Sequence, residues 1–430
     1  MAVTSTAWQR LPIVSLCAAH VDCVNRTAPV VSEPTPFKML RTTNVRHGYV
    51  DSENVRYVTE ETYKKWTRRL VPRRGDIILT REAPLGDVGK IRTDDTVFLG
   101  QRLYHFRPDP TKLDADFLLY SLLGDDLQSQ IKSFGSGSTV EHMRLEDVPS
   151  LEFNVPPLPI QRRIAGILSA YDELIENSQR RIKSLESMAR ALYREWFVHF
   201  RFPGHEHHPR VPSPLGEIPK GWEASTLAVH LASLESGKRP KGGIRDVDDG
   251  VPSIGAENIN GIGQHDFAGE KFIPREFFLE MRKGVVRDRD VAIYKDGAYI
   301  GKSSYFRDGF PHSECCVNEH VFLLRAGGIR LKQNALYLWL QEPDTVQTIR
   351  SKNANAAQPG INQQTVGGLD LTLPDSRTAA QFDQLVDPLL GEIINFAKKV
   401  QNLRRTRDLL LPRLLSGQVD LRPNGAMNTP

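Results

Sequence analysis

The pattern of hydrophobic positions predicts a long helix in the middle of the chain. After the proline-rich segment that begins at Pro156, one hydrophobic stripe advances by alternating steps of four and three residues. This 3.5-residue period lasts for more than four heptads and is typical of a coiled-coil seam. Ser178 is the polar residue on the stripe, which also includes Ala189. The other seam positions are Ile164, Leu168, Tyr171, Ile175, Ile182, Leu185, Leu192 and Trp196.

A second helix with the same stripe is predicted 218 positions later. Arg407 is its one polar seam position, and Pro388 is expected to interrupt and kink the helix near its start. An amphipathic helix this long cannot bury its stripe alone, so we expect the two helices to pack antiparallel as a coiled coil. Packing of each helix on its own globular domain is the alternative. The seam positions are Phe382, Val386, Leu389, Ile393, Phe396, Val400, Leu403, Leu410 and Leu414.

The two halves of the chain repeat each other. Asp76 and Asp290 stand in similar segments 214 positions apart, as Trp8 and Trp222 do. Short β-rich runs separated by glycine and proline turns fill about 150 residues in each half. The sequence therefore predicts an α/β (α+β) fold with two similar globular domains and a pseudo-two-fold internal repeat. The predicted segments are a first domain (1–157), a helix (158–200), a linker (201–215), a second domain (216–374), a second helix (375–417) and a tail (418–430).

Composition is ordinary for a globular protein and excludes little. The 430 residues carry a formal charge of +4, and the pI near 8.8 permits a nucleic-acid partner. No apolar run reaches the length of a membrane span, and the chain starts without a signal-peptide pattern. A cytoplasmic location is therefore expected. The four cysteines lack metal-type spacing and are expected to be reduced.

The sequence contains no recognisable catalytic motif. It has no G-x-x-x-x-G-K-[ST] phosphate loop and no E-x-K tripeptide of the kind that metal-dependent nucleases use. The segment Asn154-Val-Pro-Pro-Leu158 lacks the aromatic residue of an adenine methyltransferase motif. His142 and His312 are interpreted as isolated, and the histidines of GHEHHPR (204–210) as part of a solvated linker. We therefore expect neither a catalytic residue nor a bound metal or cofactor.

Four segments resemble the specificity subunits of Type I restriction-modification enzymes. The strongest is PPLPIQRRIAGILSAYDELIENSQRRIKSLESMARALYREWFVHFRFPG (156–204), which is similar to the central conserved region of that family. GEIPKGWEASTL (216–227) and INQQTVGGLDLTLP (361–374) resemble the start and end of its second target-recognition domain. LLPRLLSGQVDL (410–421) resembles its C-terminal conserved segment.

The resemblance implies a DNA-sequence specificity subunit that is not itself an enzyme. Each target-recognition domain would read one half of a bipartite, asymmetric double-stranded DNA site. The helices would set the spacer and dock two methylation subunits, and restriction subunits would join them. The complex would act as an adenine-specific DNA methyltransferase and a Type I endonuclease, with S-adenosylmethionine, ATP and magnesium used by the partners. A single-chain restriction-modification enzyme fragment and a coiled-coil scaffold that binds no DNA are the alternatives.

Candidate DNA contacts lie in loops at equivalent places of the two halves. Arginine, lysine, amide and hydroxyl side chains supply most phosphate and base contacts. Asn44 and Asn258 fit equally well as structural turn residues. The candidates of the first domain are Arg41, Thr42, Thr43, Asn44, Arg46, Thr80, Arg81, Ser136, Ser138 and Thr139. Those of the second are Lys238, Arg239, Lys241, Asn258, Lys295, Lys302, Asn353, Asn355 and Gln358.

Overall fold

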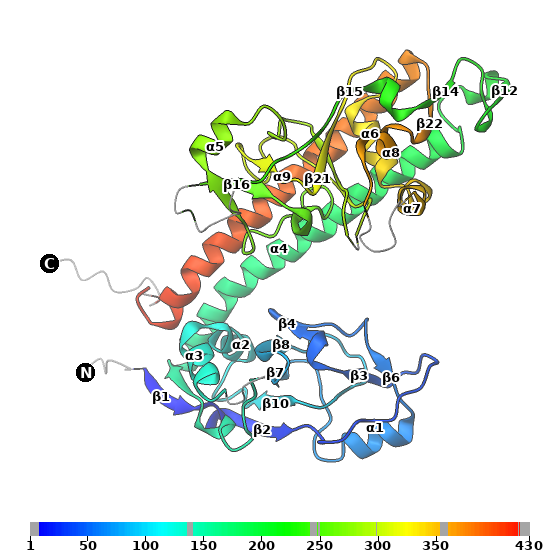
Figure 1. Ribbon diagram of the computed structural model, residues 1–430. Helices are drawn as coiled ribbons and strands as arrows, with labels where there is room; N and C mark the ends of the chain where they lie inside the picture. Colours follow the sequence, from blue (N-terminus) through cyan, green and yellow to red (C-terminus); the bar gives the residue numbers. More distant parts are fainter. Residues whose placement is uncertain are drawn as a thin grey trace. The chain divides into compact units, whose positions relative to one another are not determined.

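A computed structural model describes residues 8–135, 141–240, 250–297, 299–352 and 360–419, together with Val247 and Leu421. The chain divides into two compact units. Unit 1 consists of Met1–Glu173 and Leu403–Pro430, and unit 2 of Leu174–Asn402. Each of the two long helices therefore contributes one part to each unit (Figure 1).

Unit 1 is built on a mixed sheet with the strand order β2-β10-β7-β8-β5-β4. A second sheet has the order β6-β3-β9, and β1 pairs with β11. Helices α2 and α3 pack on this unit's main sheet, and α1 lies beside β9. The strands are β1 (Gln9–Pro12), β2 (Cys17–Asp22), β3 (Lys38–Leu40), β4 (Val45–Arg46), β5 (Gly48–Val50), β6 (Arg56–Tyr57), β7 (Ile77–Arg81), β8 (Leu85–Lys90), β9 (Val97–Leu99), β10 (Leu103–Pro108) and β11 (Glu152–Val155). The helices are α1 (Glu60–Trp66), α2 (Ala115–Leu123) and α3 (Asp125–Ser133), with 3₁₀ turns η1 (Ile13–Leu16), η2 (Thr42–Asn44) and η3 (Val148–Ser150).

Local sequence explains why these elements form. The three residues Ile77, Ile78 and Leu79 of β7 are fully buried, as expected for a central strand rich in β-branched and aliphatic side chains. Asp114 caps α2, because its carboxylate accepts hydrogen bonds from the backbone N–H groups of Asp116 and Phe117. The aromatic and aliphatic face of α2 is buried against the sheet and forms part of the hydrophobic core of this unit.

Unit 2 contains a smaller version of the same arrangement. Its main sheet has the order β15-β21-β18-β19, a second sheet has the order β17-β16-β20, and β14 pairs with β22. The hairpin β12–β13 lies apart from these sheets. The strands are β12 (Arg210–Ser213), β13 (Gly216–Pro219), β14 (Glu223–Thr226), β15 (Leu231–Ser236), β16 (Gly250–Ile254), β17 (Phe272–Pro274), β18 (Val291–Tyr294), β19 (Ser303–Tyr305), β20 (Cys316–Val317), β21 (Val321–Ala326) and β22 (Asp370–Leu373). The helices are α5 (Arg275–Glu280), α6 (Gln333–Leu340), α7 (Pro343–Ser351) and α8 (Gln363–Gly367), with short turns η5 (His205–His207), η6 (Leu227–His230) and η7 (Ala256–Asn258).

The structural repeat follows the sequence repeat closely. Strands β2 and β15 begin 214 positions apart, and β11 and β22 begin 218 positions apart. The offset is 214 for β7 and β18 but 218 for β8 and β19, so the four additional residues lie in the loop 295–302. The predicted mixed α/β fold with an internal repeat is confirmed.

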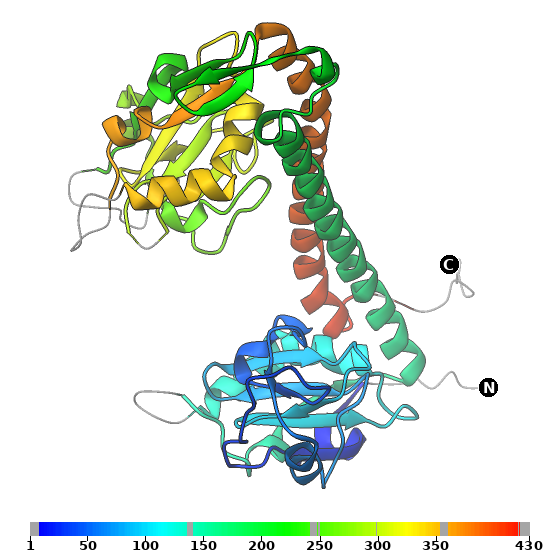
Figure 2. The ribbon, with the colours of Figure 1, turned by 90° about the vertical axis from the view of Figure 1, so that its right-hand side faces the viewer.

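The two long helices pack antiparallel within each unit. They are α4 (Leu158–Tyr193), which continues into a π-helical turn η4 (Arg194–Val198), and α9 (Ser376–Leu415). In unit 1, Leu168 near the start of α4 and Leu414 near the end of α9 belong to one core. In unit 2, the ring of Phe382 lies 4.7 Å from that of Phe197 and 5.5 Å from that of Trp196. Figure 2 shows the two helices side by side in both units.

Every predicted seam residue is buried or half-buried, as expected for a coiled-coil seam. Helix α9 also buries Leu390, Ile394 and Ala397, because its second face packs on the globular part of unit 2. The polar Ser178 is satisfied within its own helix by a 2.7 Å hydrogen bond to the carbonyl of Leu174. The expected interruption at Pro388 is wrong, because α9 continues through this residue as one helix.

The structure also bears on membrane-spanning helices and on the state of the cysteines. Within the described ranges, no helix is both long enough and apolar enough to cross a membrane. All four cysteines are free, and burial raises the pKa of the Cys315 thiol to about 12.

Candidate nucleic-acid interface

Three chain segments meet at the end of β7 in unit 1. The N–H of Arg81 donates to the carbonyl of Arg102 (2.8 Å), and the N–H of Met143 donates to the carbonyl of Arg81 (2.9 Å). The N–H of Gly100 donates to the carbonyl of Leu40 (2.8 Å), which brings in the segment that precedes η2. We call this set of backbone hydrogen bonds the edge network of the first domain. It gathers most of the loops in which the sequence placed candidate DNA contacts.

The second domain has the same edge network. The N–H of Lys295 donates to His320 (3.1 Å), and that of Ile361 donates to Lys295 (2.9 Å). The N–H of Asn318 donates to the carbonyl of Ile254 (3.0 Å). All five residues stand 214 or 218 positions after their counterparts in the first domain. The two domains therefore present equivalent loops on an equivalent backbone frame.

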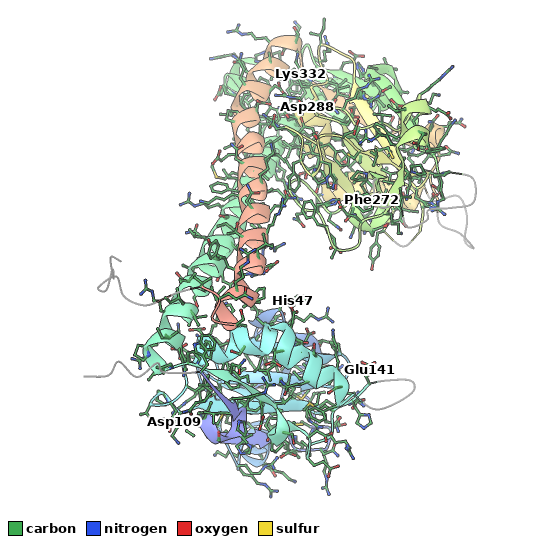
Figure 3. The ribbon with its side chains drawn as sticks, turned by 90° about the vertical axis from the view of Figure 1, so that its left-hand side faces the viewer. His47, Asp109, Glu141, Phe272, Asp288 and Lys332 are labelled. Carbon is green, nitrogen blue, oxygen red and sulfur yellow. The ribbon has the colours of Figure 1, made fainter. Side chains whose placement is uncertain are left out.

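A basic residue occupies the centre of each network. In the first domain Arg81 donates from Nη1 to the carbonyl of Met143 (2.8 Å), and Arg102 forms an ion pair with Glu82 (3.1 Å). Arg102 is exposed, and its φ of 69° turns the chain at this point. The network thus places the guanidinium group of Arg81 beside Met143, in the segment 141–143. Figure 3 labels Glu141, where the described chain resumes, and His47 on the same unit.

The second domain has other polar side chains at the same positions. Lys295 pairs with Asp296 (2.7 Å), and the Nδ1 of His320 lies 2.9 Å from the same carboxylate. The pair Asp296 and His320 is the counterpart, by position, of Glu82 and Arg102. Arginine and lysine side chains bind phosphate oxygens and the acceptor edges of bases.

The described candidates differ in how accessible they are. Thr43, Arg46, Lys238 and Arg239 are exposed, and Arg239 forms an ion pair with Glu319 (2.9 Å). Lys302 is half-buried, with its ammonium 4.5 Å from the ring centre of Tyr299. Arg41, Thr42, Arg81 and Lys295 are also half-buried. The remaining candidates lie outside the described residues: Ser136, Ser138, Thr139, Lys241, Asn353, Asn355 and Gln358.

Three candidate contacts need correction. Thr80 is fully buried, and its hydroxyl donates to the carbonyl of Pro84 (2.6 Å) and accepts from the N–H of Asp87 (2.9 Å). Asn44 and Asn258 are each 4% exposed. These three side chains shape the loops from inside and are not placed to contact a ligand.

The two asparagines act as turn residues, the alternative that the sequence left open. The amide oxygen of Asn44 accepts from the N–H of Arg41 (2.9 Å), and its Nδ2 donates to the carbonyl of Asn54 (2.9 Å). The amide oxygen of Asn258 accepts from the N–H of Asp266 (3.1 Å). Both asparagines end a 3₁₀ turn at the same place in the repeat.

The structure adds Arg102 and His320 to the candidates. Sequence reasoning missed them because neither lies in a loop with an obvious composition. Their positions are 218 apart and both are basic, so the repeat itself carried the signal.

A buried ion pair supports the opposite end of β7. Asp76 lies just before the strand, 1% exposed, and binds Arg107 of β10 and His105. Burial opposes ionisation of Asp76, but the hydrogen bonds from Arg107 and His105 outweigh it and hold the pKa of this carboxyl below its usual value. The pair fixes the strand that carries Arg81 at its other end.

Each half of the chain thus consists of an α/β domain with an edge network, followed by a long helix. Residues 34–187 match the family described as "Type I restriction modification DNA specificity domain". The matched range includes residues 156–187 of the central segment (156–204) on which the resemblance rests.

Individual relatives extend the likeness over most of the chain. The chain is 25% identical over 378 residues to the Type I restriction enzyme MjaIX specificity subunit of Methanocaldococcus jannaschii, which covers 87% of this chain and 84% of that protein. It is 19% identical over 422 residues to the HindI specificity subunit of Haemophilus influenzae, over 81% and 87% of the two chains. The crystal structure of a Type I S subunit from M. genitalium has the same fold, with a TM-score of 0.58 at 17% identity over 96% of this chain and 98% of that one.

Proposed function

We propose that this chain is the DNA-sequence specificity subunit of a Type I restriction-modification complex. The repeated edge network is the observation that carries the proposal. Two equivalent surfaces with different side chains suit the reading of two different half-sites, because direct readout depends on which donors and acceptors a loop presents. The family match and the two Type I specificity subunits to which the chain is similar support the same role.

The proposed complex divides recognition and chemistry between subunits. This chain would contribute no catalytic residue, while methylation subunits would transfer the methyl group from S-adenosylmethionine to adenine. Restriction subunits would use ATP and magnesium for cleavage. Helices α4 and α9 would dock two methylation subunits and set the spacer between half-sites. Exposed apolar side chains on these helices, including Met188 (53% exposed) and Leu409 (55% exposed), fit the docking role.

Methylation mapping tests the proposal directly. The chain would be expressed with its cognate methylation subunit in a host that lacks adenine methylation, and methyl-adenine would be mapped by long-read sequencing. A split, asymmetric motif that is absent without this chain is the expected result. A stable complex that adds no sequence-specific methylation would contradict the DNA-reading role.

A domain exchange tests the assignment of one half-site to each domain. Residues 1–157 would be replaced by the aligned segment of a relative with a different target, and the rest of the chain would be kept. One half of the methylated motif should then change while the other half stays the same. A change in both halves would contradict independent reading by the two domains. The matched control exchanges residues 216–374 and should alter the other half.

A further inference from the structure

Two histidines and one glutamate of unit 2 converge on a single point. The Nε2 of His265 lies 2.5 Å from Oε1 of Glu270, and the Nε2 of His312 contacts the same oxygen. One ligand-type atom from each of the three residues lies within 4.8 Å of the other two. We call these residues the His–Glu–His cluster. The interpretation of His312 as isolated is therefore wrong.

The cluster joins two loops that are distant in the sequence. His265 and Glu270 lie in the loop between η7 and β17, and His312 lies in the loop between β19 and β20. The side chains of His265 and Glu270 are 1% and 9% exposed, whereas that of His312 is 25% exposed. The ring of Phe267 packs edge-on against both imidazoles, at 4.6 Å and 5.7 Å. The result is a mostly enclosed site with one side open to water.

The donor set suits a transition-metal ion. Imidazole nitrogen and carboxylate oxygen are ordinary ligands of zinc, and two histidines with one glutamate form a known three-ligand set. Ligand atoms that share one tetrahedral ion at about 2.1 Å lie roughly 3.4 Å apart, so small side-chain rotations would admit the ion. Calcium and magnesium prefer oxygen ligands and are poorly matched by two imidazoles.

We propose that His265, Glu270 and His312 bind one divalent transition-metal ion, for which zinc is the best match. A water molecule would fill the fourth position on the exposed side of His312. The ion would act as a structural tie between the two loops. This site goes beyond the proposed DNA-specificity function and does not depend on it.

The first loop that the ion would join, between η7 and β17, contacts α9 directly. Gly263 has φ +71°, and a Cβ there would lie 3.1 Å from side-chain atoms of Ile393 and Ala397, so the loop presses closely on the helix. A metal ion that fixes this loop would therefore stiffen the contact between the globular part of unit 2 and α9.

The second loop that the ion would join follows β19 and forms an ion pair with α9. The guanidinium of Arg307 binds both carboxylate oxygens of Asp387, at 2.9 Å and 3.0 Å. Lys398 of the helix contacts the carbonyl of Asp308. A variant that loses the ion should therefore lose protection from hydrogen exchange in both loops and in the adjoining part of α9.

The first experiment measures metal content in the full-length chain, purified without a histidine tag. After incubation with zinc and removal of free metal, elemental analysis should find about one zinc ion per chain. His312→Gln and Glu270→Gln should each lose most of this metal. His312→Gln is the safer variant, because His312 is partly exposed and glutamine keeps a polar group there. Absence of retained zinc, iron, nickel or cobalt in the wild-type chain would overturn the proposal.

The control addresses the other histidine-rich segment of the chain. A variant with His205→Asn, His207→Asn and His208→Asn removes the imidazoles of the linker and should keep the bound zinc. Loss of zinc from this control, together with its retention in His312→Gln, would place the metal in the linker and overturn the proposal. Cobalt substitution gives a second readout, because imidazole-bound tetrahedral cobalt absorbs visible light. That absorption should appear in the control and vanish in His312→Gln.

A stability measurement separates metal binding from a simple hydrogen-bonded cluster. Zinc should raise the unfolding temperature of the wild-type chain, and a chelator should reverse the shift. His312→Gln should show neither effect while keeping its fold by circular dichroism. An identical zinc response in wild type and His312→Gln would contradict the assignment.

Discussion

Asp76 and Arg107 form a bidentate ion pair inside unit 1, and the same pair recurs in unit 2 as Asp290 and Arg325. The Nε and Nη2 atoms of Arg107 lie 2.9 Å and 2.7 Å from the two oxygens of Asp76. The corresponding distances from Arg325 to Asp290 are both 2.6 Å. The aspartates stand 214 positions apart and the arginines 218, so the pair is a side-chain feature that both halves of the repeat share. Each pair fixes the start of the strand that leads to an edge network.

Replacement of Asp76 or Asp290 should destabilise only the unit that contains it. Asp76→Asn leaves Arg107 without its counter-charge in a largely buried place, which should cost unit 1 roughly 3 to 5 kcal/mol. Hydrogen exchange read by mass spectrometry should show lost protection in β7 and β10 and little change in unit 2. Asp290→Asn is the matched variant and should give the opposite pattern. Equal loss of protection in both units for either variant would contradict independent anchoring.

The low pKa of Asp76 predicts a specific response to acid. Because the folded-state pKa lies below the unfolded value of about 3.9, the stabilisation is fully present above that value. It is lost as the pH falls through the folded-state pKa. The free energy of unfolding of unit 1, measured with urea, should therefore decrease below about pH 4. Asp76→Asn should show a smaller drop over the same pH range, and an unchanged pH dependence would refute the assignment.

Arg407, the polar residue in the seam of α9, forms an ion pair with α4. Arg407 donates from Nη1 to Asp172 of α4 (2.6 Å), and Tyr120 donates its hydroxyl to the other oxygen of Asp172 (2.6 Å). A double-mutant cycle of Asp172→Ala and Arg407→Ala should give a coupling energy of about 0.5–3 kcal/mol in unfolding experiments. The exposed pair Glu173→Ala and Arg413→Ala is the control, and its effects should add. Additivity at Asp172 and Arg407 would show that the pair does not hold the helices in register.

Neutralisation of exposed cations tests the candidate DNA surface. Arg46→Ala and Lys238→Ala should each weaken DNA binding and reduce the salt slope of log K by about 0.9, the value for one phosphate contact. Lys220→Ala, in an exposed position at the end of the β12–β13 hairpin, should leave the slope unchanged. The slope is measured by titration at several salt concentrations. A slope equal to that of wild type in both variants would remove Arg46 and Lys238 from the interface.

Helix length should control the spacer of the target. Insertion of one heptad into both α4 and α9 keeps the 3.5-residue seam and lengthens each helix by about 10 Å, which equals roughly three base pairs of DNA. The methylated motif should then keep its half-sites and gain a longer spacer. An unchanged spacer in an active complex would mean that the helices do not measure the distance. Insertion of the heptad into α4 alone is the control and should impair the complex.

Much of the fold followed from the sequence, as the long helices demonstrate. The seam of α4 and α9 was predictable because the 3.5-residue period is a local property that recurs many times along each helix. The repeat was predictable from a constant offset between similar segments. Thr80 was misplaced because a strand end with a hydroxyl and an arginine looks the same in sequence whether its side chains point inward or outward. Pro388 was misjudged because packing of the surrounding helix on unit 2 outweighs one missing hydrogen bond.

The sequence by itself determined the two-domain repeat and the paired helices, since each depends on patterns repeated along many residues. Tertiary structure alone decided which side chains meet. Asp172 and Arg407 are 235 positions apart, and His265 and His312 are 47 apart. Their contacts depend on how loops and helices close on one another, and single residues of this kind leave no periodic signal. For that reason the edge networks and the His–Glu–His cluster emerged only when the folded chain brought their parts together.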